Sequence, residues 1–303
     1  MSAPERTPPD PLFIGGTGRC GSHALARLLN RHSRYRTVPV EVRFHSDPPG
    51  LPALLAGRTE LERFVAELRG PWWESTHSDG SPRGLSRYVA AEDFEPAVAQ
   101  FERDYRSHPF GASADLIRSL LDPFASAEGK PSWVEHTKNN VASGATLLEL
   151  FPEAKIIHIL RDGRDTAASL VHQSFGPDRF KPALAWWEER LAATERGAAE
   201  LPAERLMMLR VEDLVERDRD ATYERLLEFL ELDDEQDMRW FFDRRLRPDR
   251  ANAGRWRQGL SAGRRRRVTK RYAGALERLI VADTPARGLL EDALSEARAD
   301  DTP

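Results

Sequence analysis

Hydrophobic positions along the chain form short apolar runs that alternate with helical patterns. Residues 11–14 (Pro-Leu-Phe-Ile) stop at a glycine-rich loop, after which residues 24–29 carry leucines and alanines at helical spacing. Two further apolar runs, residues 155–160 and 206–211, are also each followed by a helical pattern. Short buried strands that alternate with helices are typical of a parallel sheet covered on both faces. We therefore expect an α/β fold with a parallel sheet flanked by helices.

Residues 46–130 follow a different pattern. They contain several prolines and a tryptophan pair, with helical periodicity around residues 61–68 and 94–105 instead of strand and helix units. We interpret this region as an inserted helical lid that shapes an acceptor site within one domain spanning residues 1–303. A chain of 303 residues with 40% hydrophobic content can bury a core of that size. The polar stretch after residue 291 predicts a final helix that frays.

Composition narrows the functional class. The formal net charge of -4 argues against a general nucleic-acid coat, and a single cysteine, Cys20, excludes an intramolecular disulfide framework and a cysteine-built zinc site. Residues 1–10 lack the basic-then-apolar layout of a signal peptide, and no apolar run is long enough to span a membrane. We expect a cytoplasmic protein without nucleic-acid partners or stable membrane insertion. The sequence does not indicate its oligomeric state.

The glycine loop at residues 15–23 (Gly-Gly-Thr-Gly-Arg-Cys-Gly-Ser-His) joins the first predicted strand to a helix. Backbone N–H groups and the positive end of the helix can face an anion there. The spacing is similar to the nucleoside triphosphatase P-loop, but the lysine expected before Ser22 is absent and Arg19 lies inside the loop. An arginine and backbone donors suffice for a phosphosulfate without metal. The alternative is a turn that only permits close packing of strand and helix.

A second candidate anion site lies at the end of the run 155–160. Arg161 follows this strand and Ser169 lies in the next predicted helix, so both can converge on a phosphate at the carboxyl edge of the sheet. In the alternative interpretation, Arg161 forms an ordinary ion pair with Asp162 and Ser169 is a surface residue of the helix.

These two segments together resemble the sulfotransferases that use 3'-phosphoadenosine 5'-phosphosulfate (PAPS). The first loop is similar to their G-x-x-R-x-G-[ST] motif, and the second segment is similar to R-D followed, after six intervening residues, by serine. The resemblance covers most of the chain and implies a P-loop-like fold. It assigns the 3'-phosphate to Arg161 and Ser169. It assigns the 5'-phosphosulfate to Thr17, Gly18, Arg19, Cys20, Gly21, Ser22 and His23.

Three further segments are similar to family motifs. Residues 133–140 resemble W-x-E-K-T-P-x-N, and residues 210–214 resemble R-Y-E-D-L. Residues 254–257 resemble the loop that closes over the nucleotide, which implies that Arg255, Trp256 and Arg257 bind it. The chain departs from the family at His136, where lysine is common and helps stabilise the sulfuryl group. Histidine can replace that lysine only if it is protonated or correctly placed as a donor. Cys20, Lys138 and Val211 replace the usual serine, proline and tyrosine.

Sulfuryl transfer also needs a group that accepts the proton of the acceptor hydroxyl. Glu41 lies in residues 38–44, whose alternation predicts a strand, and the resemblance to several branches of the family makes it the candidate base. His45 and His23 are alternative bases. Glu41 could instead only form an ion pair with a neighbouring arginine such as Arg43.

We therefore predict an O-sulfotransferase that moves a sulfuryl group from PAPS to a hydroxyl of a small molecule, carbohydrate or glycolipid. Its second product is 3'-phosphoadenosine 5'-phosphate (PAP), and the catalytic residues are Glu41, Arg19 and His136, without metal. The alternatives are a P-loop kinase-like phosphotransferase and a non-catalytic nucleotide-binding module. The arginines at 264–267 predict a solvated helix face. The tryptophan pairs at 72–73 and 186–187 fit either core packing or an aromatic acceptor pocket.

Overall fold

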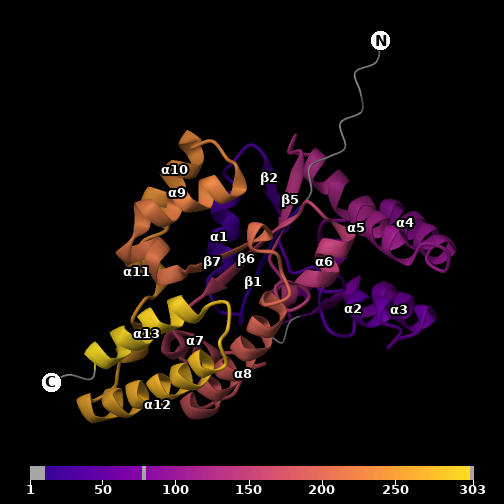
Figure 1. Cartoon of the computed structure of the whole chain (residues 1–303). Coiled ribbons are helices and arrows are strands. Elements are labelled where there is room, and N and C mark those ends of the chain that lie inside the picture. Colours follow the sequence, from indigo (N-terminus) through magenta and orange to yellow (C-terminus); the bar gives the residue numbers. More distant parts are fainter. Residues whose placement is uncertain (1–10, 77–79, 301–303) are drawn as a thin grey trace.

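The centre of the structure is a parallel sheet of five strands in the order β2-β5-β1-β6-β7 (Figure 1). The structure is a computed structural model that describes residues 11–76 and 80–300, so residues 1–10, which lack a signal-peptide layout, lie outside it. The five strands are β1 (Leu12–Gly15), β2 (Tyr35–Thr37), β5 (Ser132–Glu135), β6 (Lys155–Leu160) and β7 (Leu206–Arg210). A separate antiparallel pair consists of β3 (Ser75–Thr76) and β4 (Pro82–Arg83).

Helices cover both faces of the sheet, because neighbouring residues of a strand point to opposite sides. On β1, Leu12 and Ile14 belong to one buried cluster and Phe13 belongs to another. The first cluster contains residues of α1 (Ser22–Leu29), α9 (Arg219–Leu230) and α10 (Gln236–Arg245). The second contains residues of α2 (Leu51–Leu55), α3 (Leu61–Glu67), α4 (Ala91–Asp104), α5 (Pro109–Ser126) and α6 (Gly144–Leu150). The predicted α/β fold is confirmed.

A third buried cluster lies beyond the carboxyl end of β6 and involves Leu160, Trp187 and Leu276. Its helices are α7 (Gly163–Leu170), α8 (Phe180–Ala198), α12 (Ala262–Val281) and α13 (Arg287–Asp300). The expectation that the final helix frays after residue 291 is wrong, because α13 continues to Asp300 and buries apolar residues against α12. The remaining helical segments are η1 (Leu68–Trp72), η2 (Leu85–Arg87), η3 (Lys138–Asn140), η4 (Ala203–Arg205), η5 (Asp213–Arg217), α11 (Pro248–Ala251) and η6 (Arg255–Arg257).

The predicted strand over residues 38–44 is also wrong, because the second strand ends earlier, at Thr37. Val38 still donates its N–H to the Val134 carbonyl at 2.9 Å, but Pro39 has no N–H and cannot continue the ladder. The chain then runs as irregular backbone beyond the sheet. The apolar alternation that suggested a strand reflects side chains buried in the core (Val38, Val42, Phe44).

The helical patterns in residues 46–130 correspond to α3 and α4, and α5 adds a third long helix. Their apolar side chains, including Phe64 and Phe101, join Phe13 and Trp133 of the sheet in one buried cluster. This region is therefore integrated into the core on one face of the sheet. Its role in shaping an acceptor site stays a prediction.

Candidate active site

The glycine loop between β1 and α1 has an unusual backbone. Gly18, Arg19 and Gly21 all adopt left-handed conformations, with φ of 79°, 57° and 97°. Helix α1 begins at Ser22, and its N-cap, Gly21, has no side chain that could bond the first N–H groups. Successive N–H groups at such a turn form a concave site for an anion. A left-handed arginine is uncommon and is held only where the surrounding structure enforces it, as at functional sites.

Arg19, Arg161 and Ser169 converge at this loop. The Arg161 Nη1 donates to the Arg19 carbonyl at 3.0 Å, and the Arg19 Nε donates to the Ser169 Oγ at 3.0 Å. Arg161 Nη2 also reaches the carbonyls of Ala251 and Asn252, each at 3.1 Å. Burial, followed by the charge of Arg161, lowers the pKa of Arg19. The residues of the two predicted anion sites thus lie side by side at the ends of β1 and β6.

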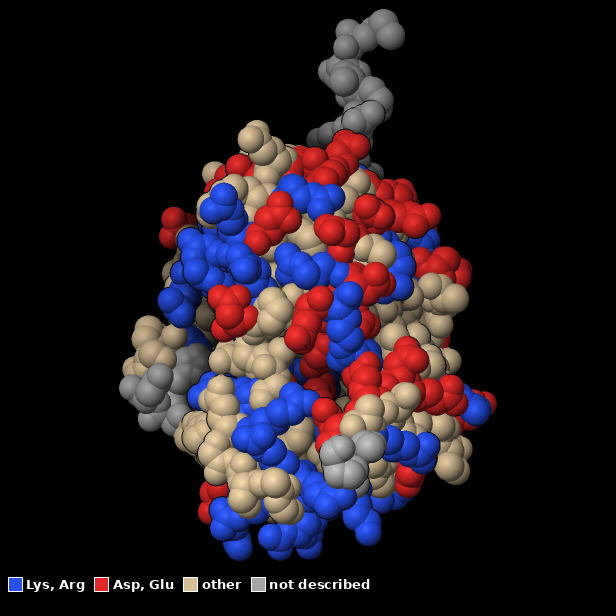
Figure 2. Space-filling view, turned by 90° about the vertical axis from the view of Figure 1, so that its left-hand side faces the viewer, with Lys and Arg blue, Asp and Glu red and all other residues tan. Residues whose placement is uncertain are grey.

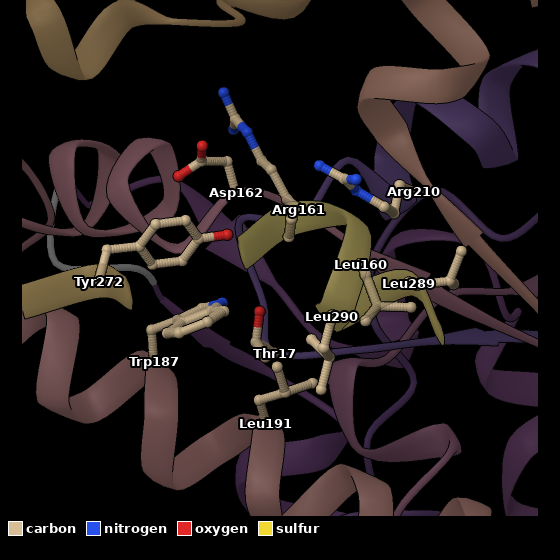
Figure 3. Close-up of a pocket in the computed structure, with 11 residues that line it drawn as sticks. Thr17, Leu160, Arg161, Asp162, Trp187, Leu191, Arg210, Tyr272, Leu289 and Leu290 are labelled. Atoms are coloured by element: carbon tan, nitrogen blue, oxygen red, sulfur yellow. The ribbon is translucent and has the colours of Figure 1, made fainter. Parts of the chain in front are cut away.

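Two side chains of the loop point into the protein. Thr17 is buried and lines a small pocket with Trp187 and Tyr272, and Arg161 and Asp162 line the same pocket (Figure 3). Cys20 is fully buried in the core beneath α1, and this burial raises the pKa of its thiol. A ligand would therefore meet these two positions through their backbone.

His23 and His136 pack edge to face, with ring centroids 4.3 Å apart. The buried His136 ring donates from Nε2 to the Val38 carbonyl at 3.0 Å, which leaves only Nδ1 for another partner. Burial, followed by the charges of His136 and Arg19, lowers the pKa of His23 to about 4. His23 is consequently neutral at pH 7 and adds no positive charge to the loop.

Glu41 lies on the irregular segment after β2. Its side chain is exposed at the surface, but the protein atoms packed around the carboxylate partly exclude water from it. This desolvation, together with the charge of Glu135, raises the pKa of Glu41. The positive charges of Lys138 and His136 act in the opposite direction. A carboxylate with a raised pKa suits general-base catalysis near neutral pH. By contrast, His45, the alternative base, is buried and bonded through Nε2 to Asn140 Oδ1 at 2.8 Å.

Glu135, the last residue of β5, is a buried hub that sequence analysis missed. Its carboxylate accepts hydrogen bonds from the Val42 N–H (3.0 Å), from both the N–H (2.8 Å) and the hydroxyl (2.7 Å) of Thr137, and from Asn140 Nδ2 (2.7 Å). His45 Nε2 lies 3.1 Å from the same group. Burial alone would raise the pKa of Glu135, but His45, His136 and Asn140 outweigh it, so the pKa lies well below the ordinary value. Glu135 therefore ties the segment carrying Glu41 to the sheet.

Replacing Glu135 by glutamine should destabilise the protein by about 1–3 kcal/mol for each buried donor that loses its acceptor. The lowered pKa also predicts a pH dependence. The stabilisation is complete above the pKa of Glu135 in the unfolded chain and is lost as the pH falls through its lower folded pKa. Urea unfolding at several pH values measures both effects. The control is Glu149→Gln, on the exposed face of α6; equal unfolding midpoints for the two variants would contradict this role.

Lys138 and Trp186 border the glycine loop and were also missed as site residues. A Cβ placed on Gly18 would lie 3.6 Å from Lys138 Cδ and 4.0 Å from Trp186 Cη2. Lys138 also accepts the Gly16 N–H through its carbonyl at 3.0 Å. The sequence contained one signal for this role, because Lys138 stands where the family motif usually has proline. Trp187, in contrast, is only 2% exposed and belongs to the core.

The residue 254–257 loop lies beside the start of α7. Asp165 accepts the N–H groups of Gly254 at 2.7 Å and Trp256 at 2.9 Å. Arg164 places its guanidinium 4.3 Å from the Trp256 ring centroid. The loop is thereby fastened to the helix that carries Ser169.

Other sequence features lie away from this site. The arginines at 264–267 are exposed at the start of α12. Figure 2 shows basic side chains gathered on the lower part of the molecular face that it presents. Trp72 is buried in the core, and Trp73 stacks on Phe94 with ring centroids 4.1 Å apart. Both tryptophans therefore pack within the helical region of residues 46–130.

Among the helices that the structure describes, none is long and apolar enough to cross a bilayer.

Fold and site together define an α/β protein with a P-loop-like glycine loop and two converging arginines between the ends of β1 and β6. The sequence model described as "Sulfotransferase family" matches residues 11–236, which is most of the chain. The chain belongs to the sulfotransferase family, as its motifs predicted.

The following relatives have low sequence identity to this chain. A protein-tyrosine sulfotransferase from Drosophila melanogaster is 22% identical over 209 residues, or 67% of this chain, which spans about a third (34%) of that relative's length. A sulfotransferase from Alicyclobacillus acidocaldarius has a similar fold, with a TM-score of 0.52 and 18% identity over 96% of this chain and 99% of that one. A mouse sulfotransferase, SULT7A1, complexed with PAP, gives a TM-score of 0.49 at 10% identity over 94% and 89% of the two chains.

Proposed function

We propose that this protein is a PAPS-dependent O-sulfotransferase acting in the cytoplasm. The observation that carries the proposal is the convergence of Arg19, Arg161 and Ser169, which brings together residues 142 and 150 positions apart in the sequence. Two guanidinium groups and a hydroxyl beside a loop of N–H groups fit a ligand with two separate phosphate-type groups. PAPS has this chemistry, because it carries a 3'-phosphate and a 5'-phosphosulfate.

In the proposed reaction, an acceptor hydroxyl attacks the sulfur of PAPS in line with the departing 5'-phosphate. An oxygen–sulfur bond forms at the acceptor, and the sulfur–oxygen bond to the phosphate breaks. The hydroxyl proton goes to the Glu41 carboxylate, and the electron pair of the broken bond stays on the phosphate of PAP. Arg19 and the loop N–H groups stabilise that charge, because positioning and electrostatics dominate such transfers.

Lys138 is a better candidate than His136 for the cation beside the transferred group. His136 has already donated its Nε2 hydrogen to Val38, whereas the Lys138 side chain runs along Gly18 and its charge acts on Glu41. A flexible ammonium can stay close to the negative charge as it builds up on the departing phosphate during transfer of the sulfuryl group. We assign His136 a supporting role, because the hydrogen on its Nε2 is already committed to the Val38 carbonyl.

The test measures donor binding and transfer separately. We expect calorimetry to show PAP binding without Mg²⁺, and mass spectrometry after incubation with PAPS to show a gain of sulfate on a hydroxyl. The acceptor panel contains phenols, sugars, glycolipids and a tyrosine peptide, the last because of the Drosophila relative. ATP binding that requires Mg²⁺ would instead support the kinase. PAP binding without any sulfated product from the panel or from host extract would support the non-catalytic module.

A further inference from the structure

The last helix, α13, contacts the donor site through two carboxylates one turn apart. Asp300 accepts hydrogen bonds from Arg257 Nη2 at 2.8 and 2.7 Å, and lies 3.0 Å from Arg164 Nη1. Glu296 accepts from both terminal nitrogens of Arg210 at 2.9 and 2.8 Å, and also pairs with Arg217. Residues four apart on a helix share one face. One face of α13 therefore contacts both the residue 254–257 loop and the end of β7.

Within the loop, two of the three residues assigned to the nucleotide are already engaged. Trp256 is only 4% exposed, donates its N–H to Asp165, and lies under the Arg164 guanidinium. Arg257 is bonded to Asp300 and folds back over its own loop, so that a Cβ on Gly254 would lie 2.8 Å from its Nη1. Both side chains anchor the loop to the surrounding helices.

Arg255 differs from both. Its side chain is exposed, and no hydrogen bond or ion pair joins it to any residue within the described ranges 11–76 and 80–300. The hollow on the Asp300 side of the loop is lined by six carboxylates and three guanidinium groups, an excess of negative charge that opposes a phosphate. Arg257, held in that hollow, is poorly placed for a phosphate, whereas Arg255 keeps all its donors available.

We propose that Asp300 is a positioning residue of the donor site, which holds Arg257 as the anchor of the loop and leaves Arg255 as the loop's phosphate-binding arginine. This inference rests on the proposed function, because the phosphate in question belongs to the nucleotide. It divides the Gly-Arg-Trp-Arg segment into one ligand and two anchors. It also makes α13 part of the donor site.

Calorimetric titration with PAP tests the division. Arg255→Ala should weaken PAP binding roughly 10–100-fold, the loss of a charge-assisted hydrogen bond, with an unchanged urea midpoint. Asp300→Asn and Arg257→Ala should each weaken it by only roughly 2–5-fold, the range of a partly exposed ion pair. The double variant should lose no more than Asp300→Asn alone, because Asp300→Asn already removes the contact with Arg257. Arg264→Ala, an exposed arginine of α12, is the control and should bind normally.

The opposite pattern would overturn the inference. If Arg257 were the phosphate ligand, Asp300→Asn would release it and tighten PAP binding, while Arg257→Ala would weaken binding strongly and Arg255→Ala would not. A wild-type protein that bound no PAP would refute the proposed function instead. The two failures are therefore distinguishable, since the inference is judged only by differences among variants of a protein that binds PAP.

Discussion

Replacing Arg19 by alanine should lower kcat/KM for sulfuryl transfer by roughly 10²–10³-fold, the loss seen when one preorganised donor to a developing anion is removed. Arg19 lies inside the left-handed turn of the glycine loop, and its guanidinium bonds Ser169, the residue assigned to the 3'-phosphate. The negative charge that develops on the departing phosphate makes this contact stronger in the transition state than in the ground state. We therefore expect a larger fall in kcat than a rise in the KM for PAPS.

A conservative variant and a control variant help to interpret the Arg19→Ala measurement. Arg19→Lys keeps the charge but loses the planar fork of donors, so its activity should fall between those of wild type and Arg19→Ala. Arg63→Ala removes an exposed arginine of α3 and should have no effect. Steady-state kinetics with labelled PAPS measure all three, and normal turnover by Arg19→Ala would remove Arg19 from the mechanism.

Replacing Glu41 by glutamine should lower kcat by roughly 10²–10⁴-fold, because the amide cannot accept the acceptor's proton. PAP binding should stay unchanged, since Glu41 lies on the segment after β2 and not in the glycine loop. In the wild type, desolvation and Glu135 raise the pKa of Glu41. Because only the ionised carboxylate is a base, kcat/KM should fall with decreasing pH, along a limb that lies above the ordinary pKa of glutamate.

The neighbouring lysine gives a second measurement of this base. Lys138 lowers the pKa of Glu41, so Lys138→Met should raise it and shift the acidic limb of the pH profile to higher pH. The matched control is Lys181→Met, an exposed lysine of α8, which should leave the limb in place. If the acidic limb of the Lys138→Met profile stayed at the wild-type pH, Glu41 would not be the titrating base.

Much of the fold was predictable because its signals are local. The apolar runs before the glycine loop and at residues 155–160 and 206–211 correspond to β1, β6 and β7 within a residue or so. The family motifs likewise identified Arg161 and Ser169, which the structure brings to the same site as Arg19. Each of these signals occupies a few consecutive residues, so it can be read without knowing what packs against it.

The sequence failed where an alternating pattern had two explanations. Residues 38–44 alternate like a strand, yet their apolar side chains pack in the core while Pro39 and the Glu135 carboxylate end the ladder. The sequence also left undecided which residue of the pair Trp186 and Trp187 is buried in the core. Successive residues of a helix point about 100° apart, so only the position of α8 decided that Trp187 is buried and Trp186 borders the loop.

The sequence by itself determined that this chain folds around a parallel sheet and carries an anion loop typical of a sulfotransferase. The tertiary structure alone decided that Glu135 supports the Glu41 segment, that Lys138 borders the loop, and that Asp300 holds Arg257 from 43 positions away. The physical reason is the range of the interactions. Strand and loop formation depend on neighbours in the sequence, whereas the partners of a carboxylate or a guanidinium are chosen by the packing of distant elements.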